Sequence, residues 1–223
     1  MNPILKRTLT GIAVGAAVIV AIVFAPPRAI MPAVSCLIVL AIIEYFQLLV
    51  LLAKKRNRTG GSTVPCFLVG AAVIACGLWA LAEIALRHGN MMLLYVVAIV
   101  KFSDVGGFAV GTATSRLMRG GNHKMCPSVS PAKSWEGLLG SLAFSCIVSC
   151  AFIPATHFAV GKSLVLGVVA ALVGTAGDLI ESRFKRWVGV KDSSTMKITN
   201  GMGGFLDMLD SLLVAPAVLL TLI

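Results

Sequence analysis

The sequence has few charged residues. Asp, Glu, Lys and Arg make up only 13% of its 223 residues, against about 25% in a typical soluble domain. Apolar residues account for 58% of the chain, and the mean hydropathy is +0.95. Such a chain has too little polar surface to cover a soluble core, so the composition predicts an integral membrane protein.

Several common catalytic motifs are also missing. The six cysteines show no CxxC or Cys/His spacing and nearly all lie in apolar runs. We therefore expect them to be small core residues rather than disulfides or zinc ligands. The absence of GxxxxGK[ST] excludes a P-loop nucleotide site. No Ser-His-Asp or Cys-His set for covalent catalysis is visible.

Apolar windows long enough to cross a hydrocarbon layer of about 30 Å occur seven times. They cover residues 9–25, 29–53, 64–86, 91–113, 137–153, 163–180 and 204–223. The sequence therefore predicts an all-α, polytopic integral membrane protein with about seven transmembrane helices.

Lysine and arginine are distributed unequally between the two sides of these spans. If the N-terminus is cytoplasmic, sixteen basic residues lie inside, and only Arg28, Arg87 and Lys162 lie outside. Cytoplasmic segments of membrane proteins carry an excess of Lys and Arg, so we expect this orientation. The net charge of +10 is then mainly an orientation signal, with attraction to anionic lipid headgroups second, and we expect no nucleic-acid partner.

Polar residues are concentrated in the second half of the chain. We expect residues 1–100 to form a scaffold of transmembrane helices. Residues 101–223 would form the catalytic region, with cytoplasmic loops 114–136 and 181–203. The one carboxylate in the middle of the first half is Glu44, for which a packing role and a functional role are equally compatible with the sequence.

Residues 177–211 contain five of the nine acidic residues of the chain. Asp178 ends one predicted span, and Asp207 and Asp210 begin the next with the i, i+3 spacing of one helix face. Three carboxylates at one membrane surface would repel one another without a cation. Oxygen ligands with no nearby His or Cys favour a hard cation such as Mg²⁺.

A magnesium site of this kind implies a substrate that carries phosphate, because Mg²⁺ is commonly held by one or two carboxylates together with substrate phosphates. The basic residues Lys185, Arg186 and Lys191 beside it point to the same substrate class. Phosphoryl or nucleotidyl transfer mainly needs positioning and charge neutralisation, which these residue types supply.

Two further polar segments precede this stretch. Lys101 and Asp104 lie about one turn apart, which fits either an ion pair in helix packing or a place in a site. The loop 115–134 ends in the sequence SPAKSWEG, where Ser134 or the serine before the proline, Ser130, would cap the helix opened by Trp135. A helix start beside Lys133 is a candidate anion site.

Several of these motifs together resemble the signature of the phosphatidate cytidylyltransferase (CDP-diacylglycerol synthase) family. They are Ser182-Arg183-Phe184-Lys185-Arg186, Lys191-Asp192, Gly203-Gly204-Phe205-Leu206-Asp207-Met208-Leu209-Asp210-Ser211, the SPAKSWEG segment, Gly177-Asp178 and Asp104-Val105-Gly106-Gly107. Two positions depart from the family pattern: Met202 stands in place of a His, and Met208 in place of an Arg. The departures indicate retained chemistry with altered contacts or a different lipid acceptor.

The resemblance implies an enzyme that joins CTP and phosphatidic acid to give CDP-diacylglycerol and pyrophosphate. It also implies Mg²⁺ as cofactor, with a monovalent cation such as K⁺ as a second ion, and a bacterial-type inner membrane with the active site facing the cytoplasm. Implied metal ligands are Asp178, Asp207 and Asp210, which with Lys191 and Asp192 form the catalytic set. Implied substrate-binding residues are Asp104, Ser130, Lys133, Ser182, Lys185 and Arg186.

Two other functions remain open from the sequence. One is a CTP-dependent lipid kinase of the polyprenol or phytol type, whose acceptor is an alcohol. The other is a catalytically silent membrane paralogue that binds lipid. In each case membrane lipids are expected partners, and the small-residue helix faces are compatible with a homodimer.

Overall fold

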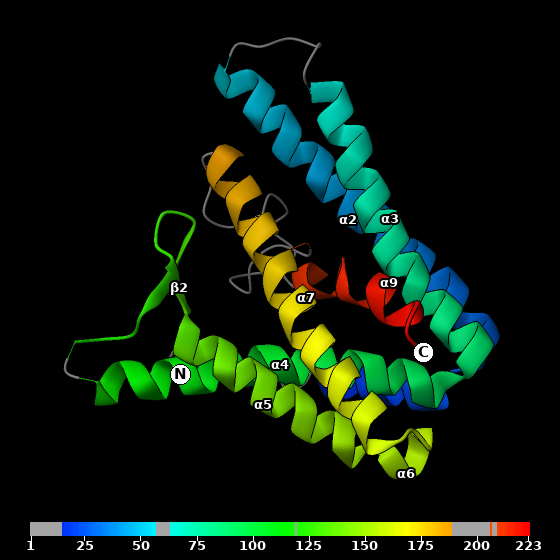
Figure 1. The fold of residues 1–223 in the computed structure, drawn as a ribbon. Coiled ribbons are helices and arrows are strands. Elements are labelled where there is room, and N and C mark those ends of the chain that lie inside the picture. Colours follow the sequence, from blue (N-terminus) through cyan, green and yellow to red (C-terminus); the bar gives the residue numbers. More distant parts are fainter. Residues whose placement is uncertain (1–14, 57–62, 119, 189–205, 207–208) are drawn as a thin grey trace, which may run out of the picture.

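The structure is a computed structural model that describes residues 15–56, 63–118, 120–188, 206 and 209–223 (Figure 1). Most of these residues are helical. The helices are Gly15–Phe24, α2 (Pro27–Arg56), α3 (Thr63–His88), α4 (Asn90–Leu117), α5 (Trp135–Ala151), α6 (Ile153–Thr156), α7 (Val160–Val188), the 3-10 helix η2 (Asp210–Leu212) and α9 (Ala215–Leu220). Two short strands, β1 (Lys124–Cys126) and β2 (Ser130–Ser134), lie between α4 and α5.

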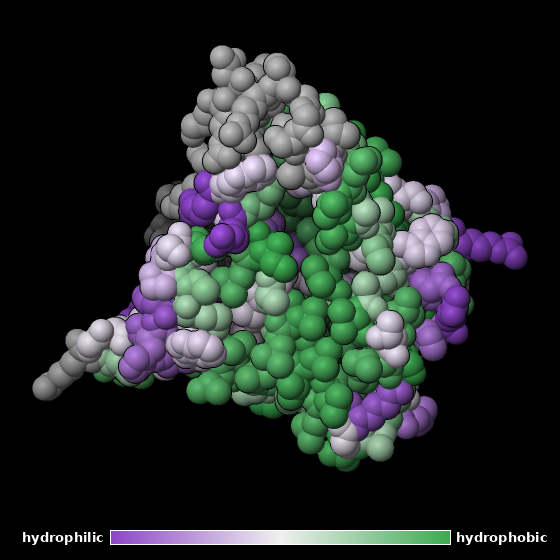
Figure 2. All heavy atoms as spheres, turned by 45° about the horizontal axis from the view of Figure 1, so that its top comes forward, coloured by the Kyte–Doolittle hydropathy of each residue, from purple (hydrophilic) through white to green (hydrophobic). Residues whose placement is uncertain are grey.

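Within the described residues, four helices are long and apolar enough to cross a membrane. These spans are Arg28–Leu51, Phe67–His88, Asn90–Leu117 and Val160–Trp187. Shorter apolar helices at Gly15–Phe24, Trp135–Ala151 and Asp210–Leu220 fall in the three remaining predicted windows. Figure 2 shows hydrophobic side chains over the centre of the face in view and hydrophilic ones toward its edges. The predicted helical, polytopic character is thus confirmed, while the count of seven spans and the orientation stay predictions.

The C-terminal window differs from the single span that its hydropathy predicts. Among its described residues, η2 is followed by a turn, and α9 starts anew at Ala215. Pro216 lies in the first turn of α9. Because proline has no N–H, it cannot continue the hydrogen bonding of a preceding helix. Figure 1 shows η2 and α9, in red, lying across the direction of α7.

A β-hairpin of two short strands, of three and five residues, lies in the segment that we predicted as a polar loop, within an otherwise mostly helical chain. β1 and β2 are antiparallel, with Lys124 opposite Ser134 and Cys126 opposite Ser130. The N–H of Val129 closes the turn by donating to the carbonyl of Cys126 (3.1 Å). Strands this short give too little alternation for hydropathy to reveal them.

Close backbone contact joins α4 to α5. A Cβ atom added at Gly106 would lie 2.5 Å from the carbonyl oxygen of Gly140, and one at Gly140 equally close to that of Gly106. Any larger side chain at either position would therefore push the two helices apart. Because glycine has no side chain, the two helix backbones can come this close, as in many membrane helix pairs.

Buried hydroxyl groups of α5 form hydrogen bonds to both α4 and α7. Ser149 of α5 lies 2.7 Å from the Tyr95 hydroxyl of α4 and donates to the carbonyl of Ser163 in α7 (2.6 Å). Ser145 donates to the carbonyl of Gly167 (2.8 Å). These hydrogen bonds satisfy polar groups that would be costly to bury alone. They also fix the relative positions of α4, α5 and α7, which carry the candidate site.

Apolar side chains from five helices form one core. The fully buried residues Leu48, Leu78, Ile99, Leu166 and Leu219 come from α2, α3, α4, α7 and α9 respectively. The N-terminal helices therefore pack directly against the elements of the second half of the chain. Residues 1–100 are not a separate layer in this part of the structure.

Candidate active site

Asp178 and Asp210 approach each other where α7 meets η2. A Cβ atom added at Gly177 would lie 3.2 Å from the carbonyl oxygen of Asp210, and one at Gly174 would lie 3.8 Å from Cβ of Ser211. The absence of a side chain at Gly177 therefore lets η2 lie close against α7, whereas a Cβ atom at Gly174 would make only an ordinary van der Waals contact. The two aspartates, distant in the sequence, therefore lie close together where α7 meets η2.

Asp104 of α4 joins this site through Ser211. The hydroxyl of Ser211 donates to Oδ2 of Asp104 (2.8 Å) and accepts from Nζ of Lys101 (2.9 Å). Lys101 and Asp104 also form the ion pair that their spacing allowed, at 3.4 Å. Ser211 is fully buried, so these bonds tie α4 firmly to η2. Sequence reasoning gave Ser211 no role, although it ends the aspartate motif.

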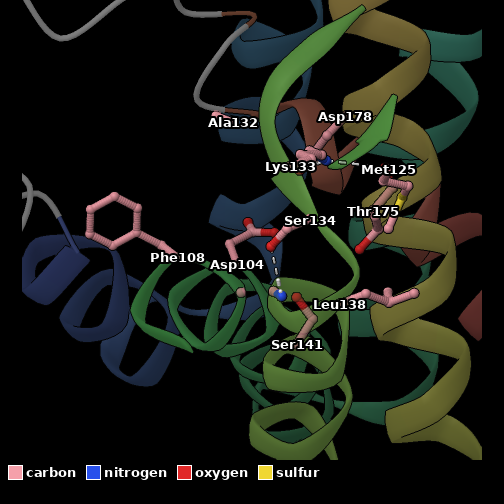
Figure 3. A pocket seen from close by; sticks show the side chains of 12 residues that line it. Asp104, Phe108, Met125, Ala132, Lys133, Ser134, Leu138, Ser141, Thr175 and Asp178 are labelled. Atoms are coloured by element: carbon pink, nitrogen blue, oxygen red, sulfur yellow. Dashed lines mark hydrogen bonds and ion pairs between the residues drawn. The ribbon is translucent and has the colours of Figure 1, made fainter. Parts of the chain in front are cut away.

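Lys133 connects the hairpin to α7. Its Nζ donates to Oδ2 of Asp178 (2.8 Å) and to the carbonyl of Thr175 (3.2 Å). The predicted anion-binding lysine therefore lies beside the predicted metal ligand. Figure 3 shows Lys133 and Asp178 pointing toward one another.

Ser134 provides the predicted helix cap. Its hydroxyl accepts from the N–H of Gly137 (3.1 Å) at the start of α5. Asn122 donates both to this hydroxyl (3.1 Å) and to the carbonyl of Gly111 in α4 (2.7 Å). The cap thus also anchors the hairpin to α4, which keeps Lys133 in place. Of the two serines considered, the structure selects Ser134.

A cavity of about 220 Å³ lies between α4, α5, α7 and the hairpin. Its lining residues are Asp104, Gly107, Phe108, Met125, Ala132, Lys133, Ser134, Gly137, Leu138, Ser141, Thr175 and Asp178 (Figure 3). Two carboxylates and one ammonium group face a cavity whose other walls are largely apolar or hydroxyl-bearing. Such a cavity suits a charged, phosphate-bearing ligand better than an apolar one.

The donor atoms of the site fit a hard cation. Oδ1 of Asp178 is buried and has no hydrogen-bond partner among the described residues. The carboxyl groups of Asp104, Asp178 and Asp210 are close enough for their charges to interact, and Lys101 and Lys133 offset only part of this negative charge. An unsatisfied carboxylate oxygen in an acidic, all-oxygen site is a suitable ligand for Mg²⁺.

The described residues hold no group of three His, Cys, Asp or Glu side chains arranged for a metal. The predicted third ligand, Asp207, lies outside the described residues. Of the three predicted metal ligands, Asp178 and Asp210 lie within the described residues, and of these two Asp178 lines the cavity while Asp210 does not.

Other predicted residues do not line this cavity. Lys185 pairs with Glu181 (2.7 Å), and both side chains are largely buried. Ser182 is half-buried on α7, and Ser130 lies at the far end of β2 from Ser134. Lys191 and Asp192, and the two atypical positions Met202 and Met208, lie outside the described residues.

Arg186 lies in a second hollow. Its Nε donates to the carbonyl of Val129 in the hairpin turn (3.4 Å). The hollow has a volume of about 520 Å³ and is lined by Ser128, Val129, Ile180, Arg183, Phe184, Arg186 and Trp187. The neighbouring residues Lys185 and Arg186 therefore point to different surroundings, which the sequence alone did not indicate.

An exposed pair holds the hairpin against the start of α5. The ring Nδ1 of His123 lies 2.7 Å from Oε1 of Glu136, and the backbone N–H of His123 donates to the same oxygen (3.1 Å). Hydrogen bonds from the His123 side chain, and then from backbone amides, lower the pKa of Glu136 to about 2. Glu136 therefore stays ionised under all ordinary conditions and supports the helix start.

The fold and site together define a class: a helical membrane protein with an acidic, lysine-containing cavity between α4, α5, α7 and the hairpin, beside the contact of α7 with η2. Residues 47–223 match the cytidylyltransferase family, and the chain belongs to this family. The family that the motifs resemble is thus confirmed.

Named relatives agree with this assignment. A phosphatidate cytidylyltransferase of Mycobacterium bovis is 36% identical over 185 residues, which cover 75% of this chain and 56% of the relative. One from Haemophilus influenzae is 40% identical over 137 residues, 57% of this chain and 44% of the relative. One from Staphylococcus aureus is 36% identical over 159 residues, 70% of this chain and 58% of the relative. The chain thus spans about half the length of the relatives it matches.

Proposed function

We propose that this chain is a nucleotidyltransferase that makes CDP-diacylglycerol and pyrophosphate from CTP and phosphatidic acid. Family membership and relatives named phosphatidate cytidylyltransferase support the reaction. The observation that carries the proposal is the meeting of Asp104, Lys133 and Asp178 around one cavity. These three residues supply charges of both signs for a metal-bound triphosphate.

A Mg²⁺ ion held by Asp178 and Asp210, with Asp207 as a further ligand and K⁺ as a candidate second ion, would neutralise phosphate charge when bound. Lys133 would move its ammonium group from Asp178 toward a phosphate oxygen, which is geometrically simple because both face the cavity. Asp104, fixed by Ser211 and Lys101, would orient the CTP side.

The reaction needs no dedicated base. An oxygen of the lipid phosphate attacks the α-phosphorus of CTP, a new P–O bond forms, and the bond to the β-phosphate breaks to release pyrophosphate. A phosphate monoester already carries the required negative charge near neutral pH. The residues then contribute by positioning and by charge neutralisation. Ser182, Lys185, Arg186, Lys191 and Asp192 complete the proposed phosphate-binding and catalytic set.

The proposed arrangement in the membrane follows the basic-residue distribution. We infer about seven spans, a cytoplasmic N-terminus and an active site that faces the cytoplasm of a bacterial-type inner membrane. Residues 101–223 would carry the chemistry on the scaffold of residues 1–100. A homodimer is compatible with the small-residue helix faces.

An activity assay on detergent-solubilised protein tests the function. CTP, dCTP and ATP are offered with phosphatidic acid at increasing Mg²⁺, and label is followed from either the cytidine or the γ-phosphate. Cytidine label entering the lipid supports the transferase. Transfer of only the γ-phosphate to an alcohol acceptor would instead identify a CTP-dependent lipid kinase. Lipid binding without any turnover would identify a silent paralogue.

A further inference from the structure

Glu44 is a buried carboxylate in the first half of the chain. It lies within the span Arg28–Leu51 of α2 and before residues 47–223, the part that matches the family. Its relative exposure is 2%. A carboxylate within a membrane span is costly unless protein groups satisfy it. The contacts of Glu44 therefore indicate why an acid lies at this position.

One of these contacts reaches the C-terminal segment. Oε2 of Glu44 accepts a hydrogen bond of 2.6 Å from the backbone N–H of Leu206. Leu206 is helical and 2% exposed, and it precedes Asp207 and Asp210 in the sequence. A hydrogen bond from an amide to a carboxylate is stronger than one between neutral groups, particularly when both are buried. Glu44 thus holds the backbone that leads into the aspartate motif.

The next residue along α2 contacts α7, the helix that carries Asp178. The ring of Tyr45 packs on Phe184 of α7 with centroids 5.0 Å apart. On its other side it fills the space beside Gly70 of α3, where even a Cβ atom would collide with the ring. Adjacent residues of α2 therefore fix both the helix that carries Asp178 and the segment that carries Asp210. Figure 1 shows this C-terminal segment, in red, between α7 and the α2–α3 pair.

We propose that Glu44 is a positioning residue for the cation site. By holding the N–H of Leu206, it fixes the chain four residues before Asp210 and so the separation of Asp210 from Asp178, the described aspartates that would bind the metal. The inference rests on the proposed function, because it takes Asp178 and Asp210 as cation ligands. It makes α2 part of the catalytic apparatus rather than scaffold alone.

Three substitutions separate acceptor geometry from charge. Glu44→Asp keeps the charge but shortens the side chain by one C–C bond, about 1.5 Å, which takes the oxygen out of hydrogen-bond range of Leu206. Glu44→Gln keeps the length and an acceptor oxygen but loses the charge. Glu44→Leu removes both. Glu83→Leu is the matched control, because Glu83 is also a carboxylate in a span but pairs with Arg87 on α3.

Two measurements are made on the full-length protein in detergent. Hydrogen exchange at the Leu206 amide, in the absence of Mg²⁺, should be about tenfold faster in Glu44→Asp and Glu44→Leu, since one hydrogen bond to a carboxylate is lost. The Mg²⁺ concentration for half-maximal effect, read both from CTP turnover and from the Mg²⁺-induced rise in Tm, should increase about tenfold in the same variants. Glu44→Gln should show a smaller increase, under about threefold, and Glu83→Leu none.

The proposal is overturned if Leu206 exchanges at the wild-type rate in Glu44→Asp. It is equally overturned if that variant lowers the Tm of the metal-free protein while its Mg²⁺ half-saturation is unchanged, because Glu44 would then serve stability alone. A larger effect of Gln than of Asp would show that charge, not position, is what matters. If wild-type protein responds to Mg²⁺ in Tm without using CTP, the proposed reaction fails while the positioning role is still decided by the Tm series.

Discussion

At the scale of single residues, Asp178 has the most informative surroundings. One of its carboxylate oxygens accepts from Lys133, and the other is buried with no hydrogen-bond partner among the described residues. Such an arrangement is costly unless a ligand completes it. Asp178 thus combines a charged partner with a buried oxygen that the proposed cation would satisfy.

Replacing Asp178 by Asn should abolish the proposed activity while preserving the fold. The side-chain shape is kept, but the charge that would bind the cation is lost, so we expect CTP turnover to fall at least about 100-fold. Turnover and Tm are measured together. Glu83→Gln, which alters a carboxylate paired with Arg87 on α3, is the matched control. Activity above a tenth of the wild-type value in Asp178→Asn would exclude Asp178 as an essential metal ligand.

The pair His123–Glu136 gives a prediction about pH. Hydrogen bonds from His123 lower the pKa of Glu136 from 4.5 to about 2 in the folded protein. A lowered folded pKa stabilises the fold above the unfolded pKa, and this contribution declines as the pH falls from about 4.5 to about 2. Isotope-edited infrared spectroscopy, with Glu136→Gln subtracted, should show a carboxylate band that persists below pH 4. A midpoint near 4.5 would show that His123 does not hold the carboxylate.

At the scale of secondary-structure elements, the contact between α7 and η2 assembles the site. Gly177 leaves only 3.2 Å between a hypothetical Cβ and the carbonyl oxygen of Asp210. The obstacle is backbone, which cannot rotate away as a flexible side chain would. A Cβ atom at this position would push the Asp210 backbone away from α7, and a larger side chain would also meet Val214.

Gly177→Val should consequently separate Asp178 from Asp210. We expect CTP turnover to fall at least about tenfold, together with weaker Mg²⁺ dependence of Tm, because the two ligands no longer meet. Gly161→Val on the same helix is the control, since nothing lies within 4 Å of a Cβ added there. Equal losses in both variants would attribute the effect to α7 itself rather than to the contact with η2.

At the scale of the whole molecule, the open question is how the chain lies in the membrane. In the part of the chain that the structure describes, four helices have the length and apolar character of spans, and three shorter apolar helices accompany them. The short helices come together with the long ones in one core, as Leu219 of α9 shows. The number of spans decides where the ends of the chain lie, because an odd number of spans places them on opposite sides of the membrane.

Fusion reporters test the predicted seven spans and cytoplasmic N-terminus. A fluorescent protein that folds only in the cytoplasm should be bright before Met1 and dark after Ile223. Alkaline phosphatase, which needs the oxidising far side, should be active after Ile223. Fluorescence at both ends would show an even number of spans and would require one of the three short helices to remain on one side of the membrane.

The sequence by itself determined the class of protein, and it predicted most of the residues of the candidate site. Hydropathy marks where helices run, because apolar side chains must face lipid or core. The residue types Asp104, Lys133, Asp178 and Asp210 define the chemistry wherever they meet, and the motif spacing was sufficient to indicate the family. These are local properties, which follow directly from the order of residues in the chain.

Only the tertiary structure decided which of these residues meet. In the structure Lys133 donates a hydrogen bond to Asp178, and Ser211 is hydrogen-bonded to both Lys101 and Asp104. Arg186 lies in a separate hollow. Glu44, whose role the sequence left open, accepts a hydrogen bond from the backbone N–H of Leu206. Such contacts join residues that are far apart in the chain. They depend on how closely helices approach, which is set by glycines, a proline and buried hydrogen bonds acting together rather than by any local pattern.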